Sequence, residues 1–161
     1  MHESIPDSVV AGLYWLAFIL TGSEDISVSV TAEVLSSASG DLRRAVVAQS
    51  VATQESELRR ARDRYQPRTD SCCESEFRAG LDAVPDFLEV RDALLAIDLF
   101  PRHALLLTVF EGFSVRDAAR WLDSNEQSIS DARSDGLLAL ARNMTPEGIT
   151  RKSQWTASNW A

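Results

Sequence analysis

The sequence predicts an all-α protein, and three of its features support this prediction. In the second half, apolar residues recur at mixed three- and four-residue spacings, which places them on one face of a helix. Turn-forming residues at 21–23 and 39–41 divide the first half into stretches of helix length. Capping patterns precede two stretches of the second half. With 161 residues, 45% of them hydrophobic and 25% charged, the chain can bury a core as one domain or as two small helical ones.

Three helices are predicted in the first half. The first begins at Pro6 and continues through the apolar run 9–20. The second is expected over residues 24–38, although its valines and serines are weak helix formers. No breaker interrupts residues 42–64, and this predicts one long helix that ends in an arginine cluster.

Four helices are predicted in the second half, each with an identifiable start. Pro85 and Pro101 begin the first two, because proline suits the first turn of a helix. Ser114 caps the third helix, and Ser124 with Gln127 forms a capping box for the last. The last three helices are expected over residues 102–111, 114–122 and 124–143.

The composition between these halves predicts two small helical domains joined by a linker. Residues 66–84 are polar and contain Pro67, the adjacent cysteines 72 and 73, and Gly80. The predicted divisions are an N-terminal helical domain over 1–65, a linker over 66–84, a C-terminal domain over 85–143 and a flexible tail over 144–161. The tail lacks helical periodicity, and its residues Trp155 and Trp160 have no assigned contact.

Charge is distributed unevenly along the chain. The net charge of −8 argues against broad, non-specific affinity for nucleic acid. Residues 1–58 carry eight acids and two arginines, and residues 69–101 carry the same numbers. The intervening stretch 59–68 has five arginines and one aspartate. A basic segment between two acidic ones can neutralise phosphates, or it can be a solvated helix end, and the sequence leaves both interpretations open.

No feature of the sequence predicts an enzyme, a cofactor or a metal site. His103 lies in a leucine-rich helix without a plausible nucleophile beside it, and no phosphate-binding loop is present. Adjacent cysteines rarely form a disulfide with each other, and they lack the further ligands of a zinc site, so we expect reduced thiols. The apolar run 13–20 is too short to span a membrane, and the acidic first residues differ from a secretory signal. These observations predict a cytoplasmic protein without membrane contact.

The segment over residues 114–140 has the pattern of a helix-turn-helix. Two helices that cross over a short turn need a small residue at the crossing, and Ala118 and Ala119 supply it. Asp123 and Ser124 form the turn, and Ile129 is expected to anchor the second helix in the core. The exposed first turns of such a second helix contact base edges in the major groove. A plain helical hairpin has similar apolar spacing and remains an alternative.

The second half resembles the sigma-70 family, and in particular its small extracytoplasmic-function group. The stretch LFPRHALLLTVFEGFSVRDAARWLDSNEQSISDARSDGLLAL matches the order of the family's final module: a leucine-rich helix, a Glu-Gly turn, a helix with a small residue and a recognition helix. The stretch LYWLAFILTGSED is similar to the start of the family's first domain. Leu58, Arg59 and Arg60 fall where that domain ends in a basic run.

The resemblance implies a divergent RNA polymerase sigma factor that binds core polymerase and, weakly, promoter DNA, with no cofactor. It places base and phosphate contacts on the two helices around the turn and on the arginine cluster. The expected DNA-binding residues are Arg116, Arg120, Asn125, Gln127, Ser128, Ser130, Arg133, Arg59, Arg60, Arg62 and Arg64.

The sequence departs from the family pattern at three surfaces. Asp131 and Asp135 on the recognition helix would repel the DNA backbone. The acidic-glutamine motif that grips the polymerase clamp would fall near residues 28–32, where VSVTA has neither acid nor glutamine. Alanines 45 and 52 stand where the family has the tryptophan and asparagine that help to open promoters. These departures favour an alternative: a sigma-like protein-binding module, or sigma mimic, whose partner is an anti-sigma protein.

Overall fold

The computed structural model describes residues 6–37, 40–68 and 86–144. Within these ranges the regular secondary structure is entirely helical, which confirms the predicted all-α class. The first half contains α1 (Asp7–Thr21), α2 (Glu24–Ser36), α3 (Leu42–Thr53) and α4 (Glu55–Arg64). The second half contains α5 (Phe87–Leu95), α6 (Leu99–Leu105), the π-helical turn η2 (Leu106–Phe110), α7 (Val115–Trp121) and α8 (Glu126–Asn143). In this part of the chain, no helix is long and apolar enough to cross a membrane.

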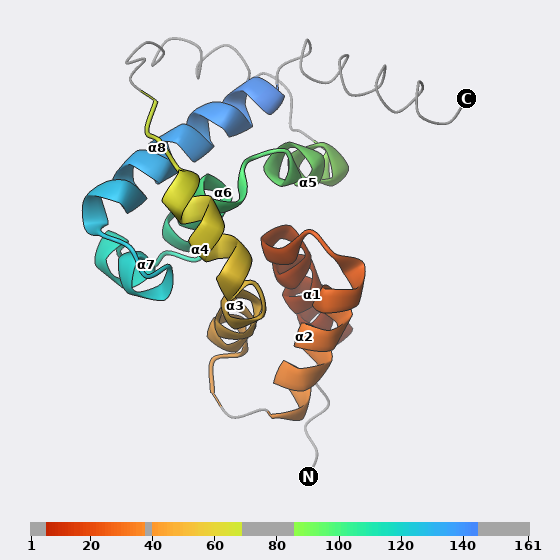
Figure 1. The fold of residues 1–161 in the computed structure, drawn as a ribbon. Helices are drawn as coiled ribbons and strands as arrows, with labels where there is room; N and C mark the ends of the chain where they lie inside the picture. The colour runs from red at the N-terminus through yellow and green to blue at the C-terminus, as the bar shows by residue number, and fades with distance from the viewer. Residues whose placement is uncertain (1–5, 38–39, 69–85, 145–161) are drawn as a thin grey trace.

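The helices α1 and α2 form an antiparallel pair whose connection was predicted from the sequence (Figure 1). Gly22 follows α1 with a φ of 70°, a left-handed conformation that glycine adopts without strain. Ser23 then caps α2, because its hydroxyl accepts a hydrogen bond from the backbone N–H of Ile26. The inner faces of α1 and α2 pack against α3 through the buried residues Leu13, Leu20, Val30, Val46 and Val47.

The prediction of a single long helix over residues 42–64 is wrong. The helix is interrupted at Gln54, between α3 and α4. The Gln54 side chain is buried, and its amide donates a 2.9 Å hydrogen bond to the carbonyl oxygen of Thr21 at the end of α1. That bond satisfies one of the carbonyls that a helix C-terminus leaves without an internal partner. A tertiary hydrogen bond therefore accompanies a break that the local sequence does not signal.

The second half is built around α6, which is buried from Phe100 to Leu105. The helix α8 crosses it closely at Gly136, where an added Cβ atom would lie 2.9 Å from the carbonyl oxygen of Pro101. The helix expected over 102–111 in fact begins at Leu99, and its last turns are π-helical. Its expected end at Gly112 is confirmed, with a φ of 69° at that residue.

Two helix starts in the second half were placed one or two residues too early in the sequence. The first residue of α5 is Phe87, since Asp86 and Glu89 form a reciprocal capping box there. The cap of α8 is Asn125 and not Ser124: the Asn125 side-chain oxygen accepts a 2.8 Å hydrogen bond from the backbone N–H of Ser128. Both residue types are good caps, so adjacent candidates are difficult to separate by sequence.

Buried residues of both halves belong to one hydrophobic cluster. The rings of Tyr65 and Phe100 pack with their centroids 5.2 Å apart, and the buried Arg102 donates to the carbonyl oxygens of Leu20 and Leu95. In Figure 1, α4 runs from α3 toward α8 and so connects the two halves. Of the expected linker, the structure describes residues 66–68; the paired cysteines and the tail beyond residue 144 lie outside the described ranges.

Candidate nucleic-acid interface

The helices α7 and α8 are joined by a short turn at residues 122–125. Ser114 caps α7 as expected, since its hydroxyl oxygen accepts a 3.1 Å hydrogen bond from the backbone N–H of Asp117. After α7, Asp123 adopts a φ of 49°, which aspartate tolerates better than most residues. Asn125 then caps α8. The residue with positive φ thus lies in the short turn between the two helices.

Small side chains bring α7 and α8 into close contact. Ala118 and Ala119 of α7 are buried, as are Ile129 and Ala132 of α8. An alanine at a helix crossing lets the backbones approach, and the larger Ile129 then fills the space in the core. Ala118, Ala119 and Ile129 are buried as expected from the sequence, and the burial of Ala132 was not predicted.

The first turn of α8 projects away from this core. Asn125 and Gln127 are exposed, whereas Ser128, Ser130 and Arg133 are half-buried. The Gln127 amide donates a 2.9 Å hydrogen bond to the carboxylate of Asp131, one turn later. Base contact by Gln127 would therefore replace an existing intrahelical hydrogen bond.

Arg116 and Arg120 of α7 both lie near acidic side chains, and Arg116 reaches the first turn of α8. The Arg116 guanidinium lies 3.1 Å from the Glu126 carboxylate, and Arg120 lies 3.8 Å from Asp117. The two arginine side chains are 70% and 75% exposed. Exposed ion pairs contribute only about 0–1 kcal/mol, so a phosphate can compete for either arginine.

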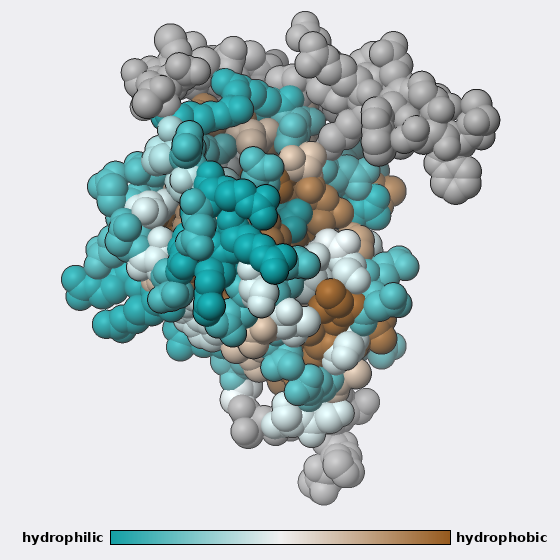
Figure 2. Space-filling view, viewed as in Figure 1, coloured by the Kyte–Doolittle hydropathy of each residue, from teal (hydrophilic) through white to brown (hydrophobic). Residues whose placement is uncertain are grey.

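The arginines of α4 divide into paired and unpaired groups. Arg59 forms an ion pair with Glu55 at 2.7 Å. Arg62 binds Asp63 and also donates to the carbonyl and carboxylate of Asp123, in the turn before α8. Within the described ranges, no ion pair involves Arg60 or Arg64, which are exposed on α4. Figure 2 shows the strongly hydrophilic surface that results over α4.

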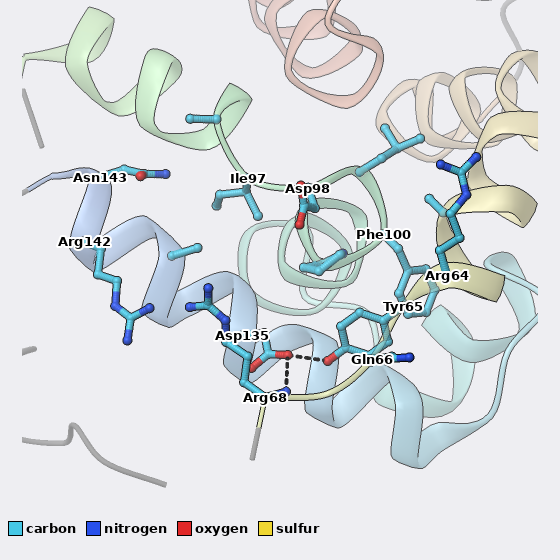
Figure 3. Close-up of a pocket in the computed structure, with 15 residues that line it drawn as sticks. Arg64, Tyr65, Gln66, Arg68, Ile97, Asp98, Phe100, Asp135, Arg142 and Asn143 are labelled. Carbon is cyan, nitrogen blue, oxygen red and sulfur yellow. Dashed lines mark hydrogen bonds between the residues drawn. The ribbon is translucent and has the colours of Figure 1, made fainter. Parts of the chain in front are cut away.

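A cavity of about 670 Å³ lies between the end of α4, α6 and α8. Figure 3 shows Tyr65 and Arg68 meeting Asp135 of α8 at its edge. The Tyr65 hydroxyl donates a 2.6 Å hydrogen bond to the Asp135 carboxylate, and the backbone N–H of Arg68 donates to the same oxygen at 3.3 Å. Burial, followed by these contacts with Asp135, raises the pKa of Tyr65, so the hydroxyl remains a donor.

The sequence did not predict the pairing of Tyr65 with Asp135 or that of Arg62 with Asp123. Both join residues more than 60 positions apart in the chain. They place the arginine cluster beside the turn between α7 and α8, so the expected DNA-binding residues of the two halves lie on neighbouring elements.

Comparison with protein-family models, with curated proteins and with solved structures finds no match to this chain. Among the described residues, no group of three or more histidines, cysteines, aspartates or glutamates lies where it could hold a metal ion.

Proposed function

We propose that this chain is a divergent sigma-type transcription protein in which α7 and α8 act as a helix-turn-helix on promoter DNA. The observation that supports the proposal is the close, alanine-lined crossing of α7 and α8, which exposes the capped first turn of α8. Asn125 and Gln127 are then the base-reading residues, with Arg116 and Arg120 near phosphates. The arginines of α4 extend the phosphate-binding surface, and core RNA polymerase is the protein partner.

The charges around this surface limit the affinity to a low value. The acidic residues Asp131 and Glu126 lie within two turns of the start of α8. Phosphate contacts supply much of the free energy of DNA binding, and Arg116, Arg120 and Arg62 must first leave their acidic neighbours. Binding should therefore be weak and steeply dependent on salt.

Replacing Arg116 and Arg120 together by alanine is expected to weaken binding to duplex DNA at least tenfold. Each lost phosphate contact should also lower the slope of log affinity against log salt by about 1. Fluorescence anisotropy with a labelled duplex over a range of salt concentrations measures both quantities.

Asp131→Lys should tighten binding several-fold in the same assay, because it removes a repulsive charge and adds a cation.

The matched controls change the same charges elsewhere. Asp25→Lys on α2 changes the net charge by the same amount as Asp131→Lys, and Arg91→Ala on α5 removes one of the two positive charges that the double arginine variant removes; both lie on helices other than α7 and α8. They should leave the affinity and the salt slope within twofold of the parent. If Asp25→Lys tightens binding as much as Asp131→Lys does, α8 does not face the DNA.

A second candidate is the sigma-like protein-binding module, and one observation favours it. At the position of the family's clamp-binding motif, Val28 is 59% exposed, and the surface beside it is an apolar groove instead of an acidic one. The ion pairs that occupy Arg62 and Arg116 point the same way. Affinity capture from the native cell separates the two functions: core polymerase with protection of a promoter fragment supports the sigma factor, and a small basic partner without polymerase supports the mimic.

The division into two domains at residues 66–84 is part of the same proposal. Limited proteolysis should cut within this stretch and leave a C-terminal fragment whose circular dichroism remains helical. The contacts of Tyr65 with Phe100 and of Arg62 with Asp123 should keep the two pieces associated during gel filtration. A single resistant fragment that spans the stretch would show that the division is wrong.

A further inference from the structure

The outer surface of the α1–α2 pair carries an apolar groove of about 490 Å³. On α2 its lining residues are Val28, Thr31, Ala32 and Leu35, and on α1 they are Asp7, Val10, Ala11, Tyr14 and Trp15. Both sets follow the i, i+3, i+4, i+7 spacing of one helix face. The opposite faces of the same two helices pack against α3, so α1 and α2 each present a second apolar stripe outward.

Two further features show that this stripe is an incomplete packing surface. Val28 is more exposed than the other large apolar residues of the described chain, and exposed apolar surface continues through Trp15 to Phe87, whose rings meet at 5.0 Å. Thr31 forms part of the buried floor of the groove, and its buried hydroxyl has no hydrogen-bond partner among the described residues. Figure 2 shows hydrophobic surface on the side of the molecule where α1 and α2 lie.

The charges around the groove have one sign. Residues 7–36 contain four acids and no lysine, arginine or histidine. Asp7 lines one end of the groove, and Glu24 lies one helical turn before Val28 at the other. An occupant therefore meets an apolar floor between two negative ends, and a second copy of this chain would bring acids against acids.

We propose that the α1–α2 groove binds an amphipathic helix of a partner protein, with an apolar stripe against the groove and basic residues at both ends of the stripe. The length from Val28 to Leu35 is about 10 Å, which matches two turns of such a helix and its i, i+3, i+4 and i+7 side chains. The partner helix would cover the outer faces of α1 and α2, opposite the faces that pack against α3. The proposal gives the partner chemistry for the protein-binding candidate, and it is independent of the DNA contact through α8.

The probe is a helical peptide of about five turns with leucine at the i, i+3, i+4 and i+7 positions and lysine elsewhere. It should bind the full chain and slow amide hydrogen exchange in residues 7–15 and 28–35. Val28→Arg should weaken binding at least tenfold, because it inserts a cation into the groove. Val109→Arg makes the same change at an exposed valine of η2 and should leave binding within twofold.

A second variant, Ala32→Gln, keeps the net charge and places a polar group in the groove, and it should weaken binding severalfold. Circular dichroism must show parental helix content for all three variants.

The proposal is overturned if Val28→Arg and Val109→Arg bind the peptide alike, or if a peptide with glutamate in place of lysine binds as tightly. It is also overturned if deletion of residues 145–161 alone deprotects the groove, since the occupant is then this chain's own tail, or if the groove is protected in a self-associated form. Loss of DNA binding in any of these variants would leave the groove result unchanged.

Discussion

Gly136→Leu is expected to lower the free energy of unfolding by about 3 kcal/mol, at the upper end of the usual effect of overpacking. Even the Cβ atom of an alanine at this position would lie 2.9 Å from the carbonyl oxygen of Pro101 and 3.1 Å from the Cβ atom of Leu105. The first of these neighbours is backbone within a buried helix, and it cannot move away as a flexible side chain would. The α6–α8 crossing must therefore open to admit a larger residue.

Gly12 offers a matched control for this substitution, because it lies inside α1 with no atom within 4 Å of an added Cβ. Gly12→Ala should raise the free energy of unfolding by about 0.5–1 kcal/mol through helix propensity alone. Gly136→Ala should be less stable than Gly12→Ala, since the close contact offsets the same gain. Urea denaturation followed by circular dichroism measures all three variants. Equal stability of the two alanine variants would show that the crossing is not tight.

Acidification is expected to destabilise the folded chain through His103. The side chain is fully buried, and burial lowers its pKa to about 4; the hydrogen bond with the carbonyl oxygen of Leu99 raises the pKa by less, and the neighbouring Arg102 lowers it further. In the unfolded chain the imidazole titrates near its usual value of about 6.5. Between these two pKa values the unfolded state binds more protons than the folded state does, so stability falls as the pH falls from about 6.5 to about 4. The full loss is about 3 kcal/mol.

The test compares the parent with His103→Leu. Leucine is similar in size to histidine, but it is apolar and has no group that binds a proton. Free energies of unfolding at pH 7 and at pH 4.5 should differ by less in the variant than in the parent. The variant loses the hydrogen bond to Leu99, so only the change with pH is informative and not the absolute stability. The same loss with acidification in both proteins would assign the pH dependence to other groups.

Features of the chain that depend on nearby residues were predicted well from the sequence. The turn after α1 follows from Gly22, which takes a left-handed conformation, and the start of α7 follows from Ser114. The burial of Ala118, Ala119 and Ile129 was also predicted, from small residues on the first helix and an apolar anchor on the second. The break at Gln54 was missed, since the bond that accompanies it reaches a carbonyl 33 positions away.

In the candidate site, too, the features set by neighbouring residues were predicted, and the contacts between the two halves of the chain were not. Asn125 and Gln127 were placed on an exposed helix start from capping and spacing, and the structure exposes both. The acidic partners of Arg62 and Tyr65 lie in the other half of the chain and have no sequence signature. The groove was missed for a similar reason: the stripes on α1 and α2 each resemble ordinary core faces, and only their pairing shows that one face of each remains uncovered.

The Nη1 group of Arg62 donates to both the carbonyl oxygen and the carboxylate of Asp123. These hydrogen bonds leave fewer donors of the guanidinium for another ligand. A phosphate that binds the Nη1 group of this arginine must displace Asp123, whose positive φ lies in the turn before α8. The hydrogen bond between Tyr65 and Asp135 adds a second link between the end of α4 and α8, about 14 Å along α8 from its first residue. The closed arrangement of the two halves and the engagement of Arg62 by an outside ligand are thus thermodynamically linked: each weakens the other by the same factor.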